Sequence, residues 1–193
     1  MLAAEPGPVL NYLISGSPTI VNGILTPASP RGFIYTKDAF NPGAGVSWTI
    51  QTKAILNVHN LAWRDFFGFV NADGSQVQAL AVETSDTNGR YGLYASNNGT
   101  SWNVRSNNPR GYFYSGTWRI FQLVCTYSSS RYNYKMGFPE TGDWTSVAAV
   151  SSHPTYGLHV AFGGGYSNNA LDGQFDLSET KIFINDALWW SAL

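Results

Sequence analysis

The side chains best suited to chemistry in this sequence are aromatic rings interleaved with amides and arginines between residues 97 and 114. This stretch reads NNGTSWNVRSNNPRGYFY, and a shorter one, SSSRYNYK, follows at residues 128–135. Flat aromatic faces stack against sugar rings, while amide and guanidinium groups hydrogen-bond the sugar hydroxyls. The pattern therefore predicts a carbohydrate-binding surface. Its candidate residues are Trp102, Tyr112, Tyr114, Asn97, Asn98, Asn107, Arg110, Arg131 and Tyr132.

The alternative interpretation of these aromatic side chains is that they alternate into a hydrophobic core. We assign the rings at positions 48, 118, 121 and 175 to the core. For Trp102 both interpretations stay open. Of Tyr112 and Tyr114 we expect one ring to lie at the surface.

Two pairs of carboxylates raise the alternative of glycan hydrolysis, a reaction that requires two carboxyl groups to flank the same bond. Glu83 with Asp86, and Asp176 with Glu179, are each three residues apart, which on a strand directs them to opposite faces. The first pair also leads into a turn, where acidic residues commonly serve the turn itself. We therefore expect no catalytic residues and no enzyme activity.

The histidines and the cysteine show no spacing that indicates a metal site or a catalytic triad. His59, His153 and His159 are scattered along the chain, and we interpret them as loop or strand residues. Cys125 lies alone in an apolar run, which indicates a buried, inert thiol. We expect no cofactor.

Calcium and phosphate sites also lack a convincing pattern. Asp73, Asp86 and Asp143 could each supply one calcium ligand, but none has a second acid within two residues. The stretch FGGGYSNN at 162–169 lacks the spacing of a phosphate-binding loop, and we interpret it as a flexible connection between sheets. We expect no metal ion.

The composition bounds the fold and excludes several classes of partner. The chain has 193 residues, of which only 12% are charged, against about 25% in an average soluble domain, and its net charge is -1. A nucleic-acid binder would show a basic patch, and none is present. No apolar stretch reaches membrane-spanning length, and MLAAEPGPVL lacks the features of a signal peptide. We expect one domain over residues 1–193, with residues 1–30 as an alternative N-terminal approach segment.

Turn chemistry predicts antiparallel strands along most of the chain. Residues 63–71, 75–85, 90–97 and 101–106 are alternating runs separated by Asp-Gly, Asn-Gly and similar turns, which predicts a four-stranded meander. Further strands are expected at 46–56, 117–127 and 131–138, and in the three segments that follow. Such short, regularly spaced strands indicate an all-β, two-sheet antiparallel sandwich or jelly roll.

The C-terminal segment GQFDLSETKIFINDALWWSAL predicts a hairpin that turns at Asn185-Asp186 and docks on the sandwich. An edge or closing strand must hide its apolar face, and a chain end can do so by pairing back into the sheet. The side chains expected to be buried are Phe175, Leu177, Ile182, Ile184, Trp189 and Trp190.

GQFDLSETKIFINDALWW resembles the closing motif of the concanavalin A-like (laminin G-like) jelly rolls found in tailed-phage virion proteins. GLYASNNGTSW and SGTWRIFQLVCTY are similar to the middle of that family, so the resemblance runs from about Trp48 to Trp190. One departure is Asp186, where the family pattern has Gly, and aspartate tolerates such a turn.

The resemblance implies a concanavalin A-like jelly roll and a virion location. It favours a non-catalytic module that binds a host-surface glycan and contacts other virion subunits, as a homo-oligomer and specifically a trimer. The alternative is a purely structural virion protein that decorates a capsid or packs within a fibre. Glycan hydrolysis ranks last. No nucleic acid and no membrane insertion are expected.

Overall fold

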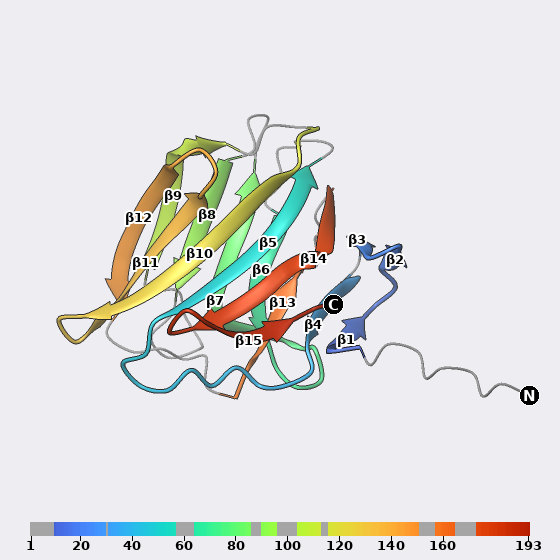
Figure 1. Cartoon of the computed structure of the whole chain (residues 1–193), viewed down its shortest axis with the longest axis horizontal. Coiled ribbons are helices and arrows are strands. Elements are labelled where there is room, and N and C mark those ends of the chain that lie inside the picture. Colours follow the sequence, from blue (N-terminus) through green and yellow to red (C-terminus); the bar gives the residue numbers. More distant parts are fainter. Residues whose placement is uncertain are drawn as a thin grey trace, which may run out of the picture.

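The computed structural model describes residues 10–29, 31–56, 64–85, 90–95, 104–112, 116–150, 157–164 and 173–193. Within these ranges the chain forms strands and turns and no helix, as the composition predicts (Figure 1). An apolar helix of membrane-spanning length is accordingly not found among these residues. The strands are β1 (Tyr12–Ser15), β2 (Thr19–Val21), β3 (Ile24–Thr26), β4 (Phe33–Thr36), β5 (Trp48–Leu56), β6 (Arg64–Val70), β7 (Gln76–Ser85), β8 (Arg90–Ala95), β9 (Val104–Tyr112), β10 (Arg119–Ser128), β11 (Arg131–Phe138), β12 (Asp143–Val150), β13 (His159–Phe162), β14 (Gly173–Ile184) and β15 (Ala187–Ser191).

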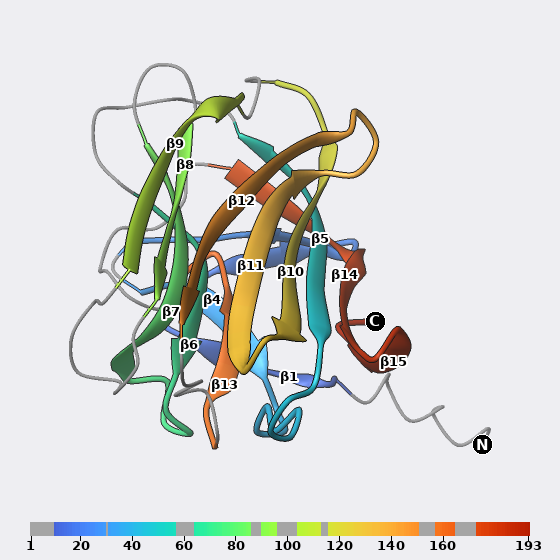
Figure 2. The ribbon, with the colours of Figure 1, turned by 90° about the vertical axis from the view of Figure 1, so that its left-hand side faces the viewer.

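The strands form two antiparallel sheets that lie face to face (Figure 2). Sheet A has the order β1-β4-β13-β6-β7-β8-β9. Sheet B has the order β12-β11-β10-β5-β14-β3-β2, and β15 pairs with β14. The fold is therefore the antiparallel two-sheet jelly-roll sandwich that the strand spacing predicts.

The predicted four-stranded meander is present as β6, β7, β8 and β9, which are consecutive neighbours in sheet A. In the turn between β6 and β7, Gly74 adopts a φ of 76° and donates to the carbonyl of Asn71 over 2.9 Å. The last strand is longer than predicted. Because β9 continues to Tyr112, the second half of the 97–114 stretch is an edge strand and not a loop.

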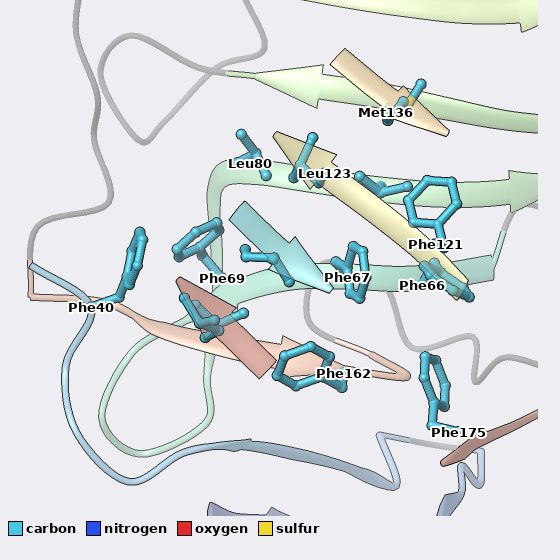
Figure 3. Packing of buried hydrophobic residues seen from close by; sticks show 14 of the residues in the cluster. Phe40, Phe66, Phe67, Phe69, Leu80, Phe121, Leu123, Met136, Phe162 and Phe175 are labelled. Atoms are coloured by element: carbon cyan, nitrogen blue, oxygen red, sulfur yellow. The ribbon is translucent and has the colours of Figure 1, made fainter. Parts of the chain in front are cut away.

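The core lies between the sheets and is rich in aromatic rings (Figure 3). On β5, Trp48, Ile50, Thr52 and Ala54 are buried, and the residues between them are partly exposed, which is the alternation that a strand predicted at 46–56 entails. Phe66 of sheet A lies 5.1 Å from both Phe121 and Phe175 of sheet B, measured between ring centroids. These contacts between facing strands join the two sheets.

Two tight turns confirm their sequence signals. Ser129 and Ser130 have φ values of 51° and 58°, and Asn185 and Asp186 have φ values of 47° and 63°. Positive φ at both central residues is the type I′ geometry that suits the twist of a two-residue hairpin. The departure from glycine at Asp186 is therefore tolerated.

β14 is an interior strand of sheet B, between β5 and β3, and not the edge strand that one reading of the sequence suggested. Its pairing with β5 is interrupted between Asp176 and Lys181 by a bulge over residues 177–180. Phe175, Leu177, Ile182 and Trp190 are buried as predicted, while Ile184 and Trp189 are partly buried. The C-terminal hairpin is thus part of the core.

The N-terminal residues also belong to the sandwich. β1 pairs with β4 at one edge of sheet A, and β3 pairs with β14 in sheet B. Figure 1 shows the C-terminal hairpin and the strands β1 to β3 on the same side of the molecule. The part of residues 1–30 that the structure describes therefore contributes strands to both sheets.

The first glycines of the FGGGYSNN stretch are tightly packed, which corrects their interpretation as a flexible connection. A Cβ atom at Gly163 would lie 2.5 Å from Pro27 Cγ, and one at Gly164 would lie 2.5 Å from Phe33 Cδ1. The amide of Gly163 also donates to the carbonyl of Phe66 over 3.0 Å. Residues 165–169 lie outside the described ranges.

Candidate functional site

The predicted carbohydrate-binding residues divide into three groups in the structure. Trp102, Tyr114, Asn97 and Asn98 lie outside the described residues. Asn107, Arg110 and Tyr112 belong to the edge strand β9. Arg131 and Tyr132 begin β11 in the other sheet.

The ladder of β7, β8 and β9 gives the register at the edge of sheet A. Tyr94 of β8 pairs with Ala81 on one side and Arg105 on the other. Two residues along, Gly92 pairs with Glu83 and Asn107. Because alternate strand positions share a face, the positions of Tyr94, Arg105 and Asn107 belong to one side of the sheet. An aromatic, a guanidinium and an amide residue are thereby neighbours in the ladder.

The pairing of β9 with β8 is irregular where Arg110 occurs. Arg90 pairs with Tyr112, but the next residue, Tyr91, pairs with Asn108, so residues 109–111 form a bulge. A bulge on an edge strand is where proline is tolerated, which explains how Pro109 fits within a strand. Arg110 therefore lies outside the regular ladder that holds Asn107.

The structure separates Tyr112 from Arg131. β10 starts at Arg119, soon after Tyr112, and extends for ten residues before the turn that precedes Arg131. A strand of that length spans roughly 30 Å at about 3.3 Å per residue. In Figures 1 and 2 the end of β9 and the β10–β11 turn lie at opposite ends of the sandwich. The predicted residues therefore do not form one continuous surface.

Tyr132 is a core residue and not a stacking surface for a sugar, which corrects its assignment. Only 6% of its surface is exposed, and its hydroxyl accepts a hydrogen bond from the amide of Gly45 over 3.1 Å. Tyr134, in the same predicted stretch, is also buried, and burial raises the pKa of its hydroxyl well above the usual value. Arg131 is exposed.

The carboxylates of β14 face lysines, not one another. Asp176 lies 3.7 Å from the ammonium of Lys53, and Glu179 lies 3.3 Å from that of Lys181. Asp176 also accepts hydrogen bonds from the amide and hydroxyl of Ser178, at 3.1 and 2.6 Å. The bulge over residues 177–180 interrupts regular alternation here, so the sequence argument that the two carboxylates point to opposite faces of a strand does not apply. The side chain of Glu83 and all of Asp86 lie outside what the structure describes.

Two reactive side chains are buried within sheets. Cys125 is fully buried, and desolvation raises the pKa of its thiol to about 12, which confirms the inert thiol. His159 is a strand residue whose Nδ1 lies 2.7 Å from the carbonyl of Thr36, so Nδ1 carries a proton and donates it. His59 and His153 lie outside the described residues.

The aspartates considered as calcium ligands act locally in turns. Asp73 accepts a hydrogen bond from the amide of Ser75 over 2.9 Å. Hydrogen bonds with Ser75 lower the pKa of the Asp73 carboxyl. Asp143 accepts the hydroxyl of Thr141 over 2.7 Å. Among the described residues, no three histidine, cysteine or acidic side chains gather into a possible metal site.

Tyr94 is the residue that sequence reasoning missed at the sheet edge. An Asn98-Gly99 turn read from the sequence would pair Tyr94 with residue 103, whereas the structure pairs it with Arg105. Turn chemistry therefore indicated a β8–β9 hairpin but not the register that brings Tyr94 beside Arg105 and Asn107.

The fold is similar to that of solved lectin-like structures. The exoplasmic/lumenal domain of VIP36, in a Ca2+/Man-bound form, aligns with a TM-score of 0.56 over 90% of this chain and 82% of its own, at 12% identity. Arcelin-5, a lectin-like defense protein from Phaseolus vulgaris, aligns with a TM-score of 0.55 over 90% of both chains, at 13% identity. The CBM2 module of evolved Dit from Lactobacillus casei BL23 phage J-1 aligns with a TM-score of 0.53 over 84% of this chain and 77% of its own, at 14% identity.

No protein-family model matches this sequence, and no curated protein matches it. At these identities the structural similarity establishes the fold. The concanavalin A-like architecture implied by the C-terminal motif is therefore confirmed.

Proposed function

We propose that this chain is a non-catalytic carbohydrate-binding module of a virion, which recognises a glycan on a host surface. Its binding surface is the β8–β9 edge of sheet A with the connections that flank β9. The contributing residues are Tyr94, Arg105, Asn107, Arg110 and Tyr112, together with Asn97, Asn98, Trp102 and Tyr114.

The observation that carries this proposal is the ladder register at that edge. Tyr94 pairs with Arg105, and Gly92 pairs with Asn107. Tyr94 and Arg105 are directly paired positions, whose Cβ atoms lie about 4.5–5.5 Å apart, and Asn107 is the diagonal neighbour of Tyr94 at about 7–8 Å. An aromatic, a guanidinium and an amide residue are therefore close enough to contact one short saccharide.

Similar structures support the ligand class. One is in a Man-bound form, one is called a lectin-like defense protein, and one is called a CBM2 module of a phage Dit. The phage module also supports the virion location, in agreement with the C-terminal motif. A low density of charge suits a neutral glycan, because binding then depends on stacking and hydrogen bonds.

The lysine pairing of Asp176 and Glu179 supports a non-catalytic role. Each carboxylate faces an ammonium group 3.3–3.7 Å away. Glycoside hydrolysis needs two carboxyl groups that flank one bond, whereas each of these carboxylates is engaged by its own lysine. We therefore expect the purified protein to release no reducing sugar from polysaccharides.

Weak single sites would gain avidity in an oligomer. Tethering several sites raises avidity by roughly 10²–10⁴. A trimer, which the resemblance to phage proteins suggests, would present three such edges. Sedimentation equilibrium measures the oligomeric state directly. A chain that stays monomeric at micromolar concentration would contradict the trimer.

A broad bacterial glycan array tests the proposed function. We expect the parent to bind, the triple variant Trp102→Ala, Tyr112→Ala, Tyr114→Ala to lose binding, and Asn107→Ala to weaken it. Binding should change little with salt, since few charges take part. Lys135→Ala is the control, because Lys135 lies on sheet B with its ammonium 4.4 Å from the ring of Trp144. Parent protein that binds no glycan, or a folded triple variant that still binds, would contradict the proposal.

A second candidate function, a structural virion protein, is favoured by the apolar edge strands. Leu13 and Ile14 on β1 are 38% and 51% exposed, and Val21 on β2 is 58% exposed. These strands are the edges of sheet A and sheet B. Replacing Ile14 and Val21 by lysine should dissociate an oligomer if subunits pack there. Retained glycan binding by the dissociated protein would favour the binding module.

A further inference from the structure

A pocket with polar and apolar lining residues lies beside the β14–β15 turn in sheet B, on the opposite sheet from the proposed β8–β9 surface. Its volume is about 360 Å³, and it is lined by Ser47, Trp48, Thr49, Val124, Cys125, Thr126, Asn185 and Asp186. Figure 1 shows the β14–β15 turn next to the start of β5 and the end of β10, where these residues come together. The volume is within the range of small-molecule sites, which begins near 300 Å³, and suits a single sugar residue.

Hydrogen bonds between the pocket walls hold its shape. The amide of Asn185 donates to the carbonyl of Ser47 over 3.0 Å, which fixes the β14–β15 turn to β5. The hydroxyl of Ser47 accepts the amide of Tyr127 over 3.3 Å, which fixes the same residue to β10. A pocket whose walls are joined in this way needs little ordering when a ligand binds.

Three polar side chains of the pocket have unused hydrogen-bonding capacity. The hydroxyl of Thr49, the amide side chain of Asn185 and the carboxylate of Asp186 make no hydrogen bond or ion pair with the described residues. They offer donors and acceptors beside the apolar side chain of Val124. A sugar presents the same combination, with hydroxyl groups around a face of C–H groups.

The charge of the pocket restricts the ligand. Asp186 is its only ionised residue among the lining side chains, and no lysine or arginine lines it. An anionic ligand would therefore be repelled, whereas hydroxyl groups would donate to the carboxylate. Hydrogen bonds to a charged acceptor are the stronger ones.

We propose that this pocket is a second saccharide site, which takes one neutral sugar residue through Asp186, Asn185 and Thr49. It shares with the proposed function only the class of ligand, and neither site requires the other. A module with sites on both sheets would contact two segments of a glycan or two chains at once.

Nuclear magnetic resonance titration of the full chain tests the pocket. The probes are D-glucose, D-galactose and N-acetyl-D-glucosamine, with D-glucuronate as the anionic comparison and calcium chloride alone as the cation comparison. We expect the neutral sugars to shift the backbone amides of Thr126, Asn185 and Asp186 with millimolar affinity. D-glucuronate should bind more weakly than D-glucose.

The matched variants are Asp186→Asn, Thr49→Val and the control Asp38→Asn. Asparagine adopts the positive φ of residue 186 readily, so Asp186→Asn should fold. Its affinity should fall about tenfold, as expected when a charged hydrogen bond is lost. Asp38 is an exposed carboxylate after β4 that does not line the pocket, so its variant should bind like the parent.

Three results would overturn this inference. They are the absence of shifts at the pocket amides with every neutral sugar, equal or larger shifts with D-glucuronate or calcium alone, and unchanged affinity in both pocket variants. Glycan-array binding that requires Asn107 while the pocket amides stay unshifted would overturn the pocket and leave the proposed function intact. Shifts at the pocket amides without any glycan-array binding would overturn the proposed function and leave the pocket intact.

Discussion

The indole ring of Trp190 stacks on the phenyl ring of Phe162, with centroids 5.6 Å apart and planes 8° from parallel. Phe162 is on β13 of sheet A, and Trp190 is on β15, which pairs with sheet B. The indole Nε1 also donates to the carbonyl of Asn11 over 2.8 Å. One side chain near the C-terminus therefore joins both sheets and the N-terminal segment.

Replacing Trp190 by alanine should destabilise the protein by about 3–5 kcal/mol, because it opens a cavity at this junction. Trp190→Phe keeps an aromatic ring but loses the hydrogen bond to Asn11, and should cost about 1 kcal/mol. Urea unfolding measures both. Leu188→Ala on the same strand is the control. Because Leu188 is 59% exposed, the free energy of unfolding of this variant should lie within about 0.5 kcal/mol of the parent's.

Deleting residues 182–193 should give insoluble or molten protein, because it removes the last three residues of the twelve-residue interior strand β14 and all of β15. Thermal unfolding followed by near-ultraviolet circular dichroism measures the outcome. A truncated chain that melts cooperatively near the parent's temperature would contradict the structural role of the hairpin.

Replacing buried Thr52 or buried Thr180 by valine should lower the free energy of unfolding by unequal amounts. The two hydroxyls lie 2.7 Å apart, and Thr180 donates to the carbonyl of Asp176 over 2.9 Å, so Thr52 donates to Thr180. Thr180→Val leaves a hydroxyl and a carbonyl unsatisfied and should cost about 2–3 kcal/mol. Thr52→Val removes the donor alone and should cost about 1 kcal/mol.

The double variant completes this thermodynamic cycle. Replacing both threonines by valine removes the unsatisfied hydroxyl of Thr52, so the double variant should be no less stable than Thr180→Val alone. Free energies of unfolding from urea titrations decide the point. Additive losses would show that the two hydroxyls act independently.

Strand positions were predictable where local chemistry sets them. The alternation from Trp48 to Ala54 and the turn at Asn185-Asp186 both follow from short-range patterns, and the structure has them. The bulge at 177–180 was not predictable, because it depends on the register between β14 and β5, which are far apart in the sequence. Non-local pairing likewise decides that β14 is interior.

Composition alone could not place the candidate site. Arg131 and Tyr132 adjoin in sequence, yet strand alternation exposes one and buries the other. Tyr112 and Arg131 share a polar, aromatic context but are separated by the length of β10. The pocket at Asn185 and Asp186 is lined by two strands, β5 and β10, and by the β14–β15 turn, so it becomes visible only once the sheet is assembled.

Gly163 and Gly142 form a matched pair that separates backbone strain from close packing. Both have positive φ, 80° and 71°, but a Cβ at Gly163 meets Pro27 whereas one at Gly142 meets nothing within 4 Å. Gly142→Ala should therefore cost about 1–2 kcal/mol for the backbone alone. Gly163→Ala should cost a further 1–3 kcal/mol, roughly, for overpacking. Equal losses in thermal or urea unfolding would show that the contact with Pro27 gives way freely.

The buried thiol of Cys125 should make the free energy of unfolding depend on pH in the alkaline range. Burial raises the pKa of its thiol from 9.0 to about 12, so above pH 9 the unfolded chain loses a proton that the folded chain keeps. Stability should therefore be unaffected by this group below pH 9 and should fall between pH 9 and 12, by up to about 1.4 kcal/mol per pH unit. The raised pKa of the Tyr134 hydroxyl acts in the same direction.

Unfolding free energies of the parent and of Cys125→Ala, measured from pH 7 to 10.5, isolate the thiol. The variant loses some core packing at every pH but should show a shallower decline above pH 9, because only the tyrosines then remain to ionise on unfolding. Thiol labelling at pH 8 should likewise be limited by unfolding, since a protonated, buried thiol does not react. Parallel slopes in parent and variant, or rapid labelling of the folded protein, would contradict a buried, neutral Cys125.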